Sequence, residues 1–301
     1  MVYDLIIIGA GPAGITASVY AARNRLNFLV VTKDIGGQTA WSGDVENYTG
    51  YQFITGPDLA AKFEEHMRKY GIAVKENVEA VDIKKAGKTF LINTDKGEYE
   101  ARAVIIASGK ISKELGVPGE KEFKNRGLTY CATCDGPLFS GKDVAVVGGG
   151  NSALDAVLQL MKIARRVYVI NINPRLGGDA VMRDKIEAGS TVTVLNNSQV
   201  TSVIGDKMVT GIKIKRGDKE ELLSVQGVFV EIGLVPNSGF AKKVDKNAYG
   251  EIKVNCKNET NVAGIFAAGD VTDVPEKQIV IAAGEGSKAA LAAFRYINQN
   301  R

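Results

Sequence analysis

Two of the three cysteines, Cys131 and Cys134, stand two residues apart in the stretch Tyr-Cys-Ala-Thr-Cys-Asp-Gly, residues 130–136. Sulfurs with this spacing reach each other within one turn, and a C-x-x-C pair often has a lowered thiol pKa, so that the thiolate nucleophile is populated. Asp135 follows directly and places a carboxyl group beside the sulfurs as a candidate proton carrier. The spacing therefore predicts a reversible, redox-active disulfide, with Cys131, Cys134 and Asp135 as catalytic residues.

The pair has two plainer interpretations, a zinc knuckle and a pair of inert buried thiols. A zinc knuckle needs four soft ligands. Only Cys256 and the single histidine, His66, are left to complete it, and neither has paired-ligand spacing. His66 lies off the apolar stripe of a helix predicted over residues 57–70, so we expect it to be exposed. A lone cysteine is commonly a small buried hydrophobe, which is the expectation for Cys256. We favour redox chemistry and predict no metal site.

The elements before this pair predict a nucleotide-binding module. Residues 5–8, Leu-Ile-Ile-Ile, are typical of a parallel strand buried on both faces. They run into Gly-Ala-Gly-Pro-Ala-Gly, residues 9–14, which are followed by a helical pattern over 15–23 and an apolar strand over 28–32. This is G-x-G-x-x-G in the strand-turn-helix setting that dinucleotide binding requires.

Each glycine of this motif has a separate purpose. Gly9 allows the tight turn, Gly11 lets the backbone approach a pyrophosphate, and Gly14 lets the helix pack closely on the strand. Asp34 lies twenty residues after Gly14, where an acid often binds ribose hydroxyls. The alternative for Asp34 is a solvated turn residue.

A second copy of this design follows the cysteines. Gly148, Gly150 and Ala153 form G-x-G-x-x-A after an apolar run, with a helix predicted over 154–163 and a strand over 166–171. Two such turns favour two nucleotide-binding modules, with Asn151 and Ser152 as further candidate contacts to a nicotinamide nucleotide. The same fold without a ligand is the alternative, because the turn also serves packing.

The second module does not identify its nucleotide. An acid at the end of its second strand would bind the ribose of NAD, and an arginine cluster would bind the 2′-phosphate of NADP. Asn171 stands there instead, and Arg175 is a single guanidinium. NADPH is therefore disfavoured. NADH remains a candidate donor, for which Asn171 would supply part of the ribose contact.

The C-terminal part resembles the first module in its chemistry. An apolar strand over residues 264–270 ends at Asp270, and a Gly- and Ala-rich helix is predicted over 278–297. Gly- and Pro-containing connectors lie at 109–119 and 236–239. We therefore predict an α/β protein with two Rossmann-like domains, the second inserted into the first, and rotation about the connectors. The predicted boundaries are 1–112, 113–240 and 241–301.

Composition restricts the location and the partners. With 301 residues and a net charge of +4, the chain has scattered basic residues and few interleaved aromatics, which argues against nucleic acid. The apolar run at the start is too short for a signal peptide or a membrane span. Together with the low cysteine content, this predicts a cytoplasmic protein that does not bind membranes.

With these motifs the chain resembles the low-molecular-weight thioredoxin reductases, which are class II pyridine nucleotide-disulfide oxidoreductases. The likeness covers the whole length and includes Gly-Gly-Gln38, Val-Glu-Asn47, Cys-Ala-Thr-Cys-Asp and Ala-Ala-Gly-Asp270 in the order of that family. It is strongest to the reductase portion of the alkyl hydroperoxide reductase flavoprotein subunit, through Cys134-Asp-Gly-Pro-Leu-Phe and Lys277-Gln.

The resemblance implies FAD in the first domain, with its pyrophosphate at residues 9–14 and Asp270 at the ribityl chain. It implies that Cys134 faces the flavin, Cys131 attacks the partner disulfide and Asp135 serves as acid. The implied FAD-binding residues are Gly9, Gly11, Pro12, Ala13, Gly14, Asp34, Gly37, Gln38, Asn47, Ala107, Gly109, Gly269, Asp270, Lys277, Gln278 and Ile279.

The same resemblance implies a homodimer and a thioredoxin- or glutaredoxin-like partner. The alkyl hydroperoxide reductase flavoprotein has an additional N-terminal thioredoxin-fold region, and this chain starts at the flavin domain, so we expect a separate redoxin. An alternative is the same disulfide reduction driven by a reduced ferredoxin, which a mildly basic surface would favour. A flavin-binding scaffold with a structural metal is an alternative of another class.

Overall fold

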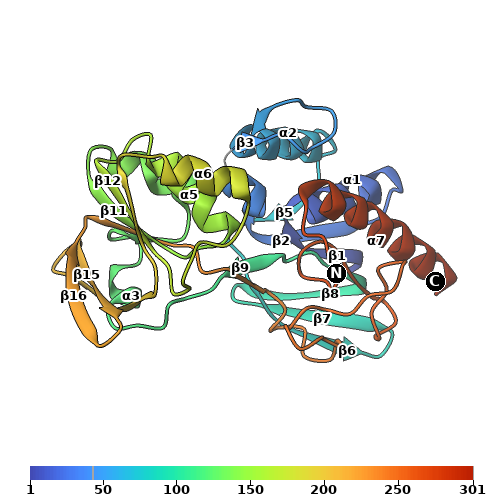
Figure 1. Ribbon diagram of the computed structural model, residues 1–301. Coiled ribbons are helices and arrows are strands. Elements are labelled where there is room, and N and C mark those ends of the chain that lie inside the picture. Colours follow the sequence, from blue (N-terminus) through green and yellow to red (C-terminus); the bar gives the residue numbers. More distant parts are fainter. Residues whose placement is uncertain (43, 301) are drawn as a thin grey trace. The chain divides into compact units, whose positions relative to one another are not determined.

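The computed structural model describes residues 1–42 and 44–300. The chain divides into two compact units: an outer unit, made of Met1–Ile111 and the segment from Val235 onward, and an inserted unit, Ser112–Leu234 (Figure 1). The inserted unit is continuous in sequence, whereas the outer unit is made of two separate segments. The domain boundaries predicted from the sequence, after residues 112 and 240, stay predictions.

The outer unit is built around a mainly parallel sheet. Its elements are β1 (Val2–Ala10), α1 (Pro12–Arg23), β2 (Phe28–Ile35), η1 (Gly37–Trp41), β3 (Asp44–Val45), β4 (Ile54–Thr55), α2 (Gly56–Lys69), β5 (Val74–Lys75), β6 (Ala80–Ala86), β7 (Thr89–Thr94), β8 (Gly97–Ile106), β19 (Ile265–Ala267) and α7 (Ile279–Gln299). The parallel strands lie in the order β5-β2-β1-β8-β19, and β8 also pairs antiparallel with β7, which pairs with β6.

Strand β1 shows why its residues are apolar on both sides. Leu5 and Ile7 face one core with the alanines of α1 and α7, while Ile6 and Ile8 face another with Phe90 of β7. A strand between two buried faces has no solvent-facing side, so polar alternation is absent from it. Helices therefore cover one face of the sheet, and the antiparallel strands with residues 240–271 cover the other.

The inserted unit repeats this plan. Its elements are α3 (Glu120–Phe123), β10 (Leu128–Thr129), α4 (Ala132–Asp135), η2 (Gly136–Phe139), β11 (Asp143–Val147), α5 (Asn151–Leu160), β12 (Arg166–Ile170), α6 (Ala180–Glu187), β13 (Val192–Leu195), β14 (Ser198–Gly205), β15 (Val209–Arg216), β16 (Lys219–Ser224) and β17 (Gly227–Val230). Five parallel strands lie in the order β13-β12-β11-β17-β10, and β14-β15-β16 form an antiparallel sheet.

The two parallel sheets have equivalent strand orders. In each, the first strand of the glycine motif is central, the strand after the helix lies on one side of it, and a later strand of the unit lies on the other. In the inserted unit, α5 and α6 pack on one face of the sheet and β14 and β15 on the other (Figure 1). Each glycine turn therefore lies at the carboxyl end of a central strand, where ligands of such sheets bind.

The two chain crossings between the units are short strands. β9 (Lys110–Ser112) and β18 (Leu234–Pro236) pair with each other as a two-stranded sheet. β9 lies within the predicted connector 109–119, whereas β18 meets the predicted connector 236–239 only at Pro236. Among residues 1–42 and 44–300, no helix combines the length and apolar character needed to span a bilayer.

Candidate active site

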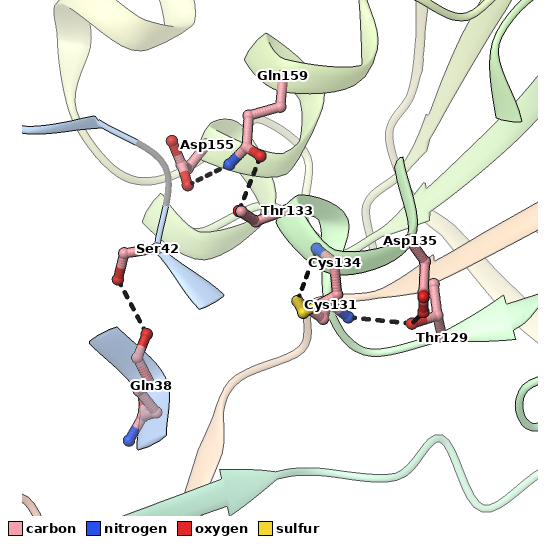
Figure 2. The surroundings of a disulfide bond; sticks show 9 residues. All are labelled: Gln38, Ser42, Thr129, Cys131, Thr133, Cys134, Asp135, Asp155 and Gln159. Carbon is pink, nitrogen blue, oxygen red and sulfur yellow. Dashed lines mark hydrogen bonds between the residues drawn. A yellow bond between two sulfur atoms is a disulfide. The ribbon is translucent and has the colours of Figure 1, made fainter. Parts of the chain in front are cut away.

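Cys131 and Cys134 form a disulfide, with their Cα atoms 5.4 Å apart (Figure 2). Cys131 precedes the single-turn helix α4, and its Sγ accepts a 3.0 Å hydrogen bond from the backbone N–H of Cys134. The predicted pairing of these two cysteines is thus present in the structure. An N–H directed at sulfur favours the thiolate over the thiol, because it stabilises negative charge on that atom.

Asp135 is connected to Cys131 through Thr129. The hydroxyl of Thr129 donates to the carboxylate of Asp135, and the same hydroxyl oxygen accepts from the backbone N–H of Cys131 at 3.2 Å (Figure 2). The carboxyl group therefore lies one side chain away from the backbone of the cysteine. Sequence reasoning placed Asp135 beside the sulfurs but did not identify Thr129 as the residue that orients it.

A buried carboxylate holds the residue before Cys131. Glu120 is 2% exposed and accepts from the hydroxyl of Tyr130 at 2.7 Å and from the backbone N–H groups of Leu115 and Gly116 at 2.6 and 2.7 Å. Burial, followed by the hydrogen bond to Glu120, raises the pKa of Tyr130 well above its ordinary value. Tyr130 therefore stays a protonated donor that anchors the start of the redox loop.

The outer unit contains a cavity of about 410 Å³ at the carboxyl ends of its parallel strands. Most of the residues implied for FAD line it. They are Gly9, Gly11, Pro12, Ala13, Asp34, Gly37, Gln38, Ala107, Gly109, Gly269, Asp270, Lys277, Gln278 and Ile279. These residues come from both sequence segments of the outer unit, so the fold brings together motifs that are far apart in the chain.

Two of the implied residues lie behind this lining. A Cβ on Gly14 would lie 1.9 Å from the carbonyl oxygen of Gly9, so Gly14 is needed for close packing of α1 on the turn. Asn47 is exposed, and its amide donates to Oε1 of Gln278 at 3.1 Å. Asn47 therefore contacts a residue of the lining rather than the cavity.

The cavity fits a dinucleotide cofactor at its glycine turn. A Cβ on Gly11 would meet no atom within 4 Å, so this backbone faces open space. Helix α1 begins after Gly11 with no side-chain cap and no acid in its first turn, whereas α2 is capped by the hydroxyl of Thr55. Uncapped N–H groups at a helix start are donors for a phosphate. Helix α7 likewise begins without a side-chain cap, after Gln278 of the lining.

Asp270 lies among cations in this cavity. Gln38 Nε2 is 3.5 Å from Oδ2 of Asp270. Burial raises the pKa of Asp270 above its ordinary value, and the nearby charges of Lys277 and Lys110 oppose that rise. The carboxyl group is therefore held in a partly desolvated position where it can accept hydrogen bonds from a ligand hydroxyl.

Two of these cations share one carboxylate that sequence reasoning missed. Nζ of Lys110 and Nζ of Lys277 lie 3.1 and 3.2 Å from Oε1 of Glu251, and all three side chains are largely buried. Burial alone would raise the pKa of Glu251, but hydrogen bonds from Asn247, Lys110 and Lys277 outweigh it, and the pKa lies below its ordinary value. Only the long-range pairing of the fold reveals this cluster, because its members are separated in sequence.

The second glycine turn has the same geometry as the first. Gly148 has φ +140°, and a Cβ there would lie 2.1 Å from the carbonyl oxygen of Glu231, while a Cβ on Gly150 would meet nothing within 4 Å. Helix α5 begins after Gly150 without a side-chain cap. Asn151 is already engaged, since its Oδ1 accepts from the backbone N–H of Asp179 at 2.8 Å.

Asn171 is buried and its amide is engaged within the protein. Its Nδ2 donates to the carbonyl oxygen of Asn173 at 3.1 Å and to Oδ1 of Asn196 at 2.7 Å, and its Oδ1 accepts from the backbone N–H of Asn173 at 3.2 Å. Both amide hydrogens are therefore used. Arg175 lies exposed in the following loop. At the end of β12, the side chain of Asn171 therefore has little left to offer a ribose hydroxyl besides one lone pair on its Oδ1.

The remaining candidates lie apart from these sites. His66 is exposed on α2, as predicted from the apolar stripe. Cys256 is also exposed, so the expectation that it is a small buried hydrophobe was wrong. It alternates with Ile252 and Val254, a pattern that would place it on their buried face, but the structure puts Cys256 in the turn that follows them. Within the described part of the chain, no three His, Cys, Asp or Glu side chains are grouped as metal ligands.

Comparison with known proteins identifies the family. Residues 3–286 match the family described as pyridine nucleotide-disulphide oxidoreductase. The chain belongs to this family. It is thus an oxidoreductase with the thioredoxin reductase-like fold, and the predicted class of two Rossmann-like domains is confirmed. The family resemblance inferred from the motifs is confirmed as well.

Three relatives illustrate the likeness. The F component of alkyl hydroperoxide reductase in Staphylococcus aureus strain MSSA476 is 40% identical over 302 residues, covering 99% of this chain and 60% of its own length. The thioredoxin reductase of Lactococcus lactis (FR conformation) has a TM-score of 0.90 and 31% identity, with 99% of both chains covered. A ferredoxin-flavin thioredoxin reductase from Clostridium acetobutylicum has a TM-score of 0.55 and 34% identity, covering 99% of this chain and 98% of its own. The chain spans about three fifths of the curated relatives it matches.

Proposed function

We propose that the protein is an FAD-dependent disulfide reductase that passes electrons through Cys131 and Cys134 to a thioredoxin- or glutaredoxin-like protein. The observation that carries this proposal is the disulfide on α4, in a chain whose outer unit also has a cavity with an open glycine turn. A disulfide whose Cys131 sulfur accepts a backbone N–H is chemically suited to open and close, because that bond stabilises a thiolate.

The outer unit would hold FAD through the residues of its cavity. The uncapped N–H groups at the start of α1, next to Gly11, would bind the pyrophosphate, and Asp270 would accept from the ribityl chain. Asp34 lies in the lining at the end of β2, where it would reach the adenosine ribose. When bound, reduced FAD supplies two electrons at a time.

The cysteines would carry these electrons by breaking and forming S–S bonds. Opening Cys131–Cys134 consumes two electrons and one proton: the S–S bond breaks, the sulfur of Cys131 leaves as a thiolate, and Cys134 becomes a thiol. Asp135, the residue next to Cys134, would relay that proton from solvent to the sulfur of Cys134.

The thiolate of Cys131 would then attack one sulfur of the partner disulfide. The partner's S–S bond breaks, a mixed disulfide forms, and the partner's other sulfur leaves as a thiolate and takes up a proton. Cys134 then attacks the sulfur of Cys131, the second partner sulfur leaves as a thiolate, and the proton of Cys134 passes to it. The Cys131–Cys134 bond is restored and the partner is released as a dithiol, so the electrons and protons balance.

For the electron donor, we propose NADH rather than NADPH among the nicotinamides. The open backbone at Gly150 and the uncapped start of α5 would bind a pyrophosphate in either case. No arginine cluster follows β12, so the extra phosphate of NADPH would lack its charge-assisted partners. Gly148, Asn151 and Ser152 would complete the contact, while Ala153 is fully buried and packs beneath Gly148.

A reduced ferredoxin is the second candidate donor. The amide of Asn171 is engaged within the protein, which weakens the case for any nicotinamide at this site. The likeness to a reductase named for ferredoxin agrees with that reading. By the same family likeness, we propose a homodimer in the cytoplasm.

Anaerobic titration of the purified flavoprotein with NADH, NADPH and reduced ferredoxin would test both parts of this proposal. The absorbance of the flavin shows which donor reduces it, and a thiol count shows whether two thiols form beyond Cys256. A Cys131→Ser/Cys134→Ser variant is the control. Flavin that becomes reduced while Cys131 and Cys134 stay bonded would contradict the function.

A further inference from the structure

A string of hydrogen bonds joins the redox loop to helix α5 (Figure 2). Thr133 stands between the two cysteines, and its hydroxyl donates to Oε1 of Gln159 at 2.9 Å. Nε2 of Gln159 in turn donates to Oδ2 of Asp155 at 2.8 Å. All of these residues belong to the inserted unit, and none of them is needed to explain the disulfide itself.

Asp155 determines which group donates and which accepts in each of these hydrogen bonds. A carboxylate only accepts, so Asp155 requires the NH₂ side of Gln159 and leaves the amide oxygen for Thr133. Gln159 and Asp155 are four residues apart on α5, which is the spacing of neighbours on one helix face. Helix α5 is itself anchored by Leu154, Val157 and Leu160 in the core of the unit. The string thus ends on a rigid element.

Helix α4 has little stability of its own. It has four residues, of which only Ala132 is buried, and a helix this short does not persist without tertiary contacts. In the oxidised protein the Cys131–Cys134 bond closes this turn. Reduction removes that covalent link, so the contacts of Thr129 and Thr133 must hold the turn afterwards.

The orientation of α4 matters because of one N–H group. The backbone N–H of Cys134 points at the sulfur of Cys131 from 3.0 Å. It stabilises a thiolate on Cys131 only while the helical turn is kept. If the loop relaxed after reduction, this donor would be lost, and a smaller fraction of Cys131 would be present as the nucleophilic thiolate.

We propose that Gln159 is a positioning residue for the redox pair: through Thr133 it keeps the N–H of Cys134 directed at the sulfur of Cys131 after the disulfide opens. This inference rests on the proposed role of the pair as a reversible disulfide. Asp155 fixes the amide of Gln159, and Thr133 transmits that orientation to the turn between the cysteines.

The test compares variants in a Cys134→Ser/Cys256→Ala background, where Cys131 is the only thiol. The pH dependence of its alkylation by iodoacetamide in the holoprotein reports its pKa. We expect Thr133→Val and Gln159→Leu to raise this pKa by about one unit, a tenfold loss of thiolate below it. Thr133→Ser keeps the hydroxyl and should retain the original profile. Thr201→Val, which removes a hydrogen-bonded hydroxyl on β14, is the control for general loosening.

A second readout uses the protein with both cysteines. A tenfold loss of the stabilised reduced form lowers the midpoint potential of the pair by about 30 mV, measured against a dithiol redox buffer. Unchanged pKa and potential in Thr133→Val and Gln159→Leu, with native circular dichroism, would overturn the inference. Equal shifts in Thr133→Ser and Thr133→Val would do the same, because the hydroxyl would then not matter. Failure of the proposed function would be recognised separately, as a wild-type pair that does not exchange electrons with the flavin.

Discussion

The side-chain amide of Asn171 donates a 2.7 Å hydrogen bond to Oδ1 of Asn196, which lies just after β13. The residue at the end of β12 thus pairs with the neighbouring strand end instead of facing outward. Contacts to the ribose of a nucleotide would therefore have to come from the loop that follows β12. Exposed positions of that loop, such as Ile172, are open to change without disturbing the buried amide.

Arginines placed in this loop should create a preference for NADPH. We expect Ile172→Arg/Asn173→Arg to tighten NADPH binding by more than about tenfold, because each charge-assisted hydrogen bond contributes about 1.5–3 kcal/mol. NADH binding should change less. Binding is measured by calorimetry on the oxidised protein. Met208→Arg/Leu222→Arg adds the same charge at two exposed positions, one in the turn between β14 and β15 and one on β16, and is the control. Equal gains for both nucleotides would count against the placement of the 2′-phosphate.

Cys134→Ser should leave FAD bound and reducible while turnover with a disulfide substrate falls by more than about a hundredfold, because no internal disulfide can form. Cys131→Ser should be equally inactive. The measurements are flavin content, flavin reduction and thioredoxin reduction on the same preparation. Substantial thioredoxin reduction by either variant would refute the assigned roles.

Cys256→Ala should change neither activity nor stability. Cys256 is exposed and has no neighbouring thiol, and surface substitutions of this kind stay within about 0.5 kcal/mol. The check is turnover together with the midpoint of urea unfolding. A loss of turnover with normal flavin content would assign this cysteine a function.

Gly14→Ala and Gly11→Ala should fail in different ways. A Cβ on Gly14 would lie 1.9 Å from the Gly9 carbonyl, so we expect a loss of about 1–3 kcal/mol or more in the free energy of unfolding. A Cβ on Gly11 would meet no protein atom, so the fold should persist while FAD affinity falls. Thermal unfolding and flavin content separate the two effects. Normal flavin affinity in Gly11→Ala would contradict the proposal that the pyrophosphate binds at this turn.

Glu231 should make the stability of the inserted unit pH-dependent. Burial, followed by the charge of Asp155, raises the pKa of Glu231 from 4.5 to about 8. Between these values the folded state binds the proton more tightly than the unfolded state, so stability falls as pH rises, with a slope approaching about 1.4 kcal/mol per pH unit. Glu231→Gln should flatten this slope in urea unfolding from pH 5 to 8 (roughly the window set by these pKa values). Glu221→Gln, at an exposed position, is the control. An unchanged slope in Glu231→Gln would show that this carboxyl is not the titrating group.

The glycine turns and the cysteine pair could be predicted because each is a local pattern. Residues 9–14 carry the strand, turn and helix signals within one short stretch, and Cys131 and Cys134 define their own geometry. The Glu251 cluster and the contact between Thr133 and Gln159 could not, since they depend on which strands pair and how α4 packs on α5. The burial of Asn171 was missed for the same reason: its partner Asn196 lies on a separate strand end.

The discontinuity of the outer unit determines when its cavity can exist. Gly11 and Gln38 are made early during synthesis, but Asp270 and the start of α7 follow only after the entire inserted unit. The alanine-lined face of α1 therefore stays uncovered until α7 has been synthesised. Meanwhile, Ser112–Leu234 is free to fold as one continuous segment. The two segments that line the cavity are therefore both present only late in synthesis, and a chain stalled before its final helix would present an aggregation-prone surface.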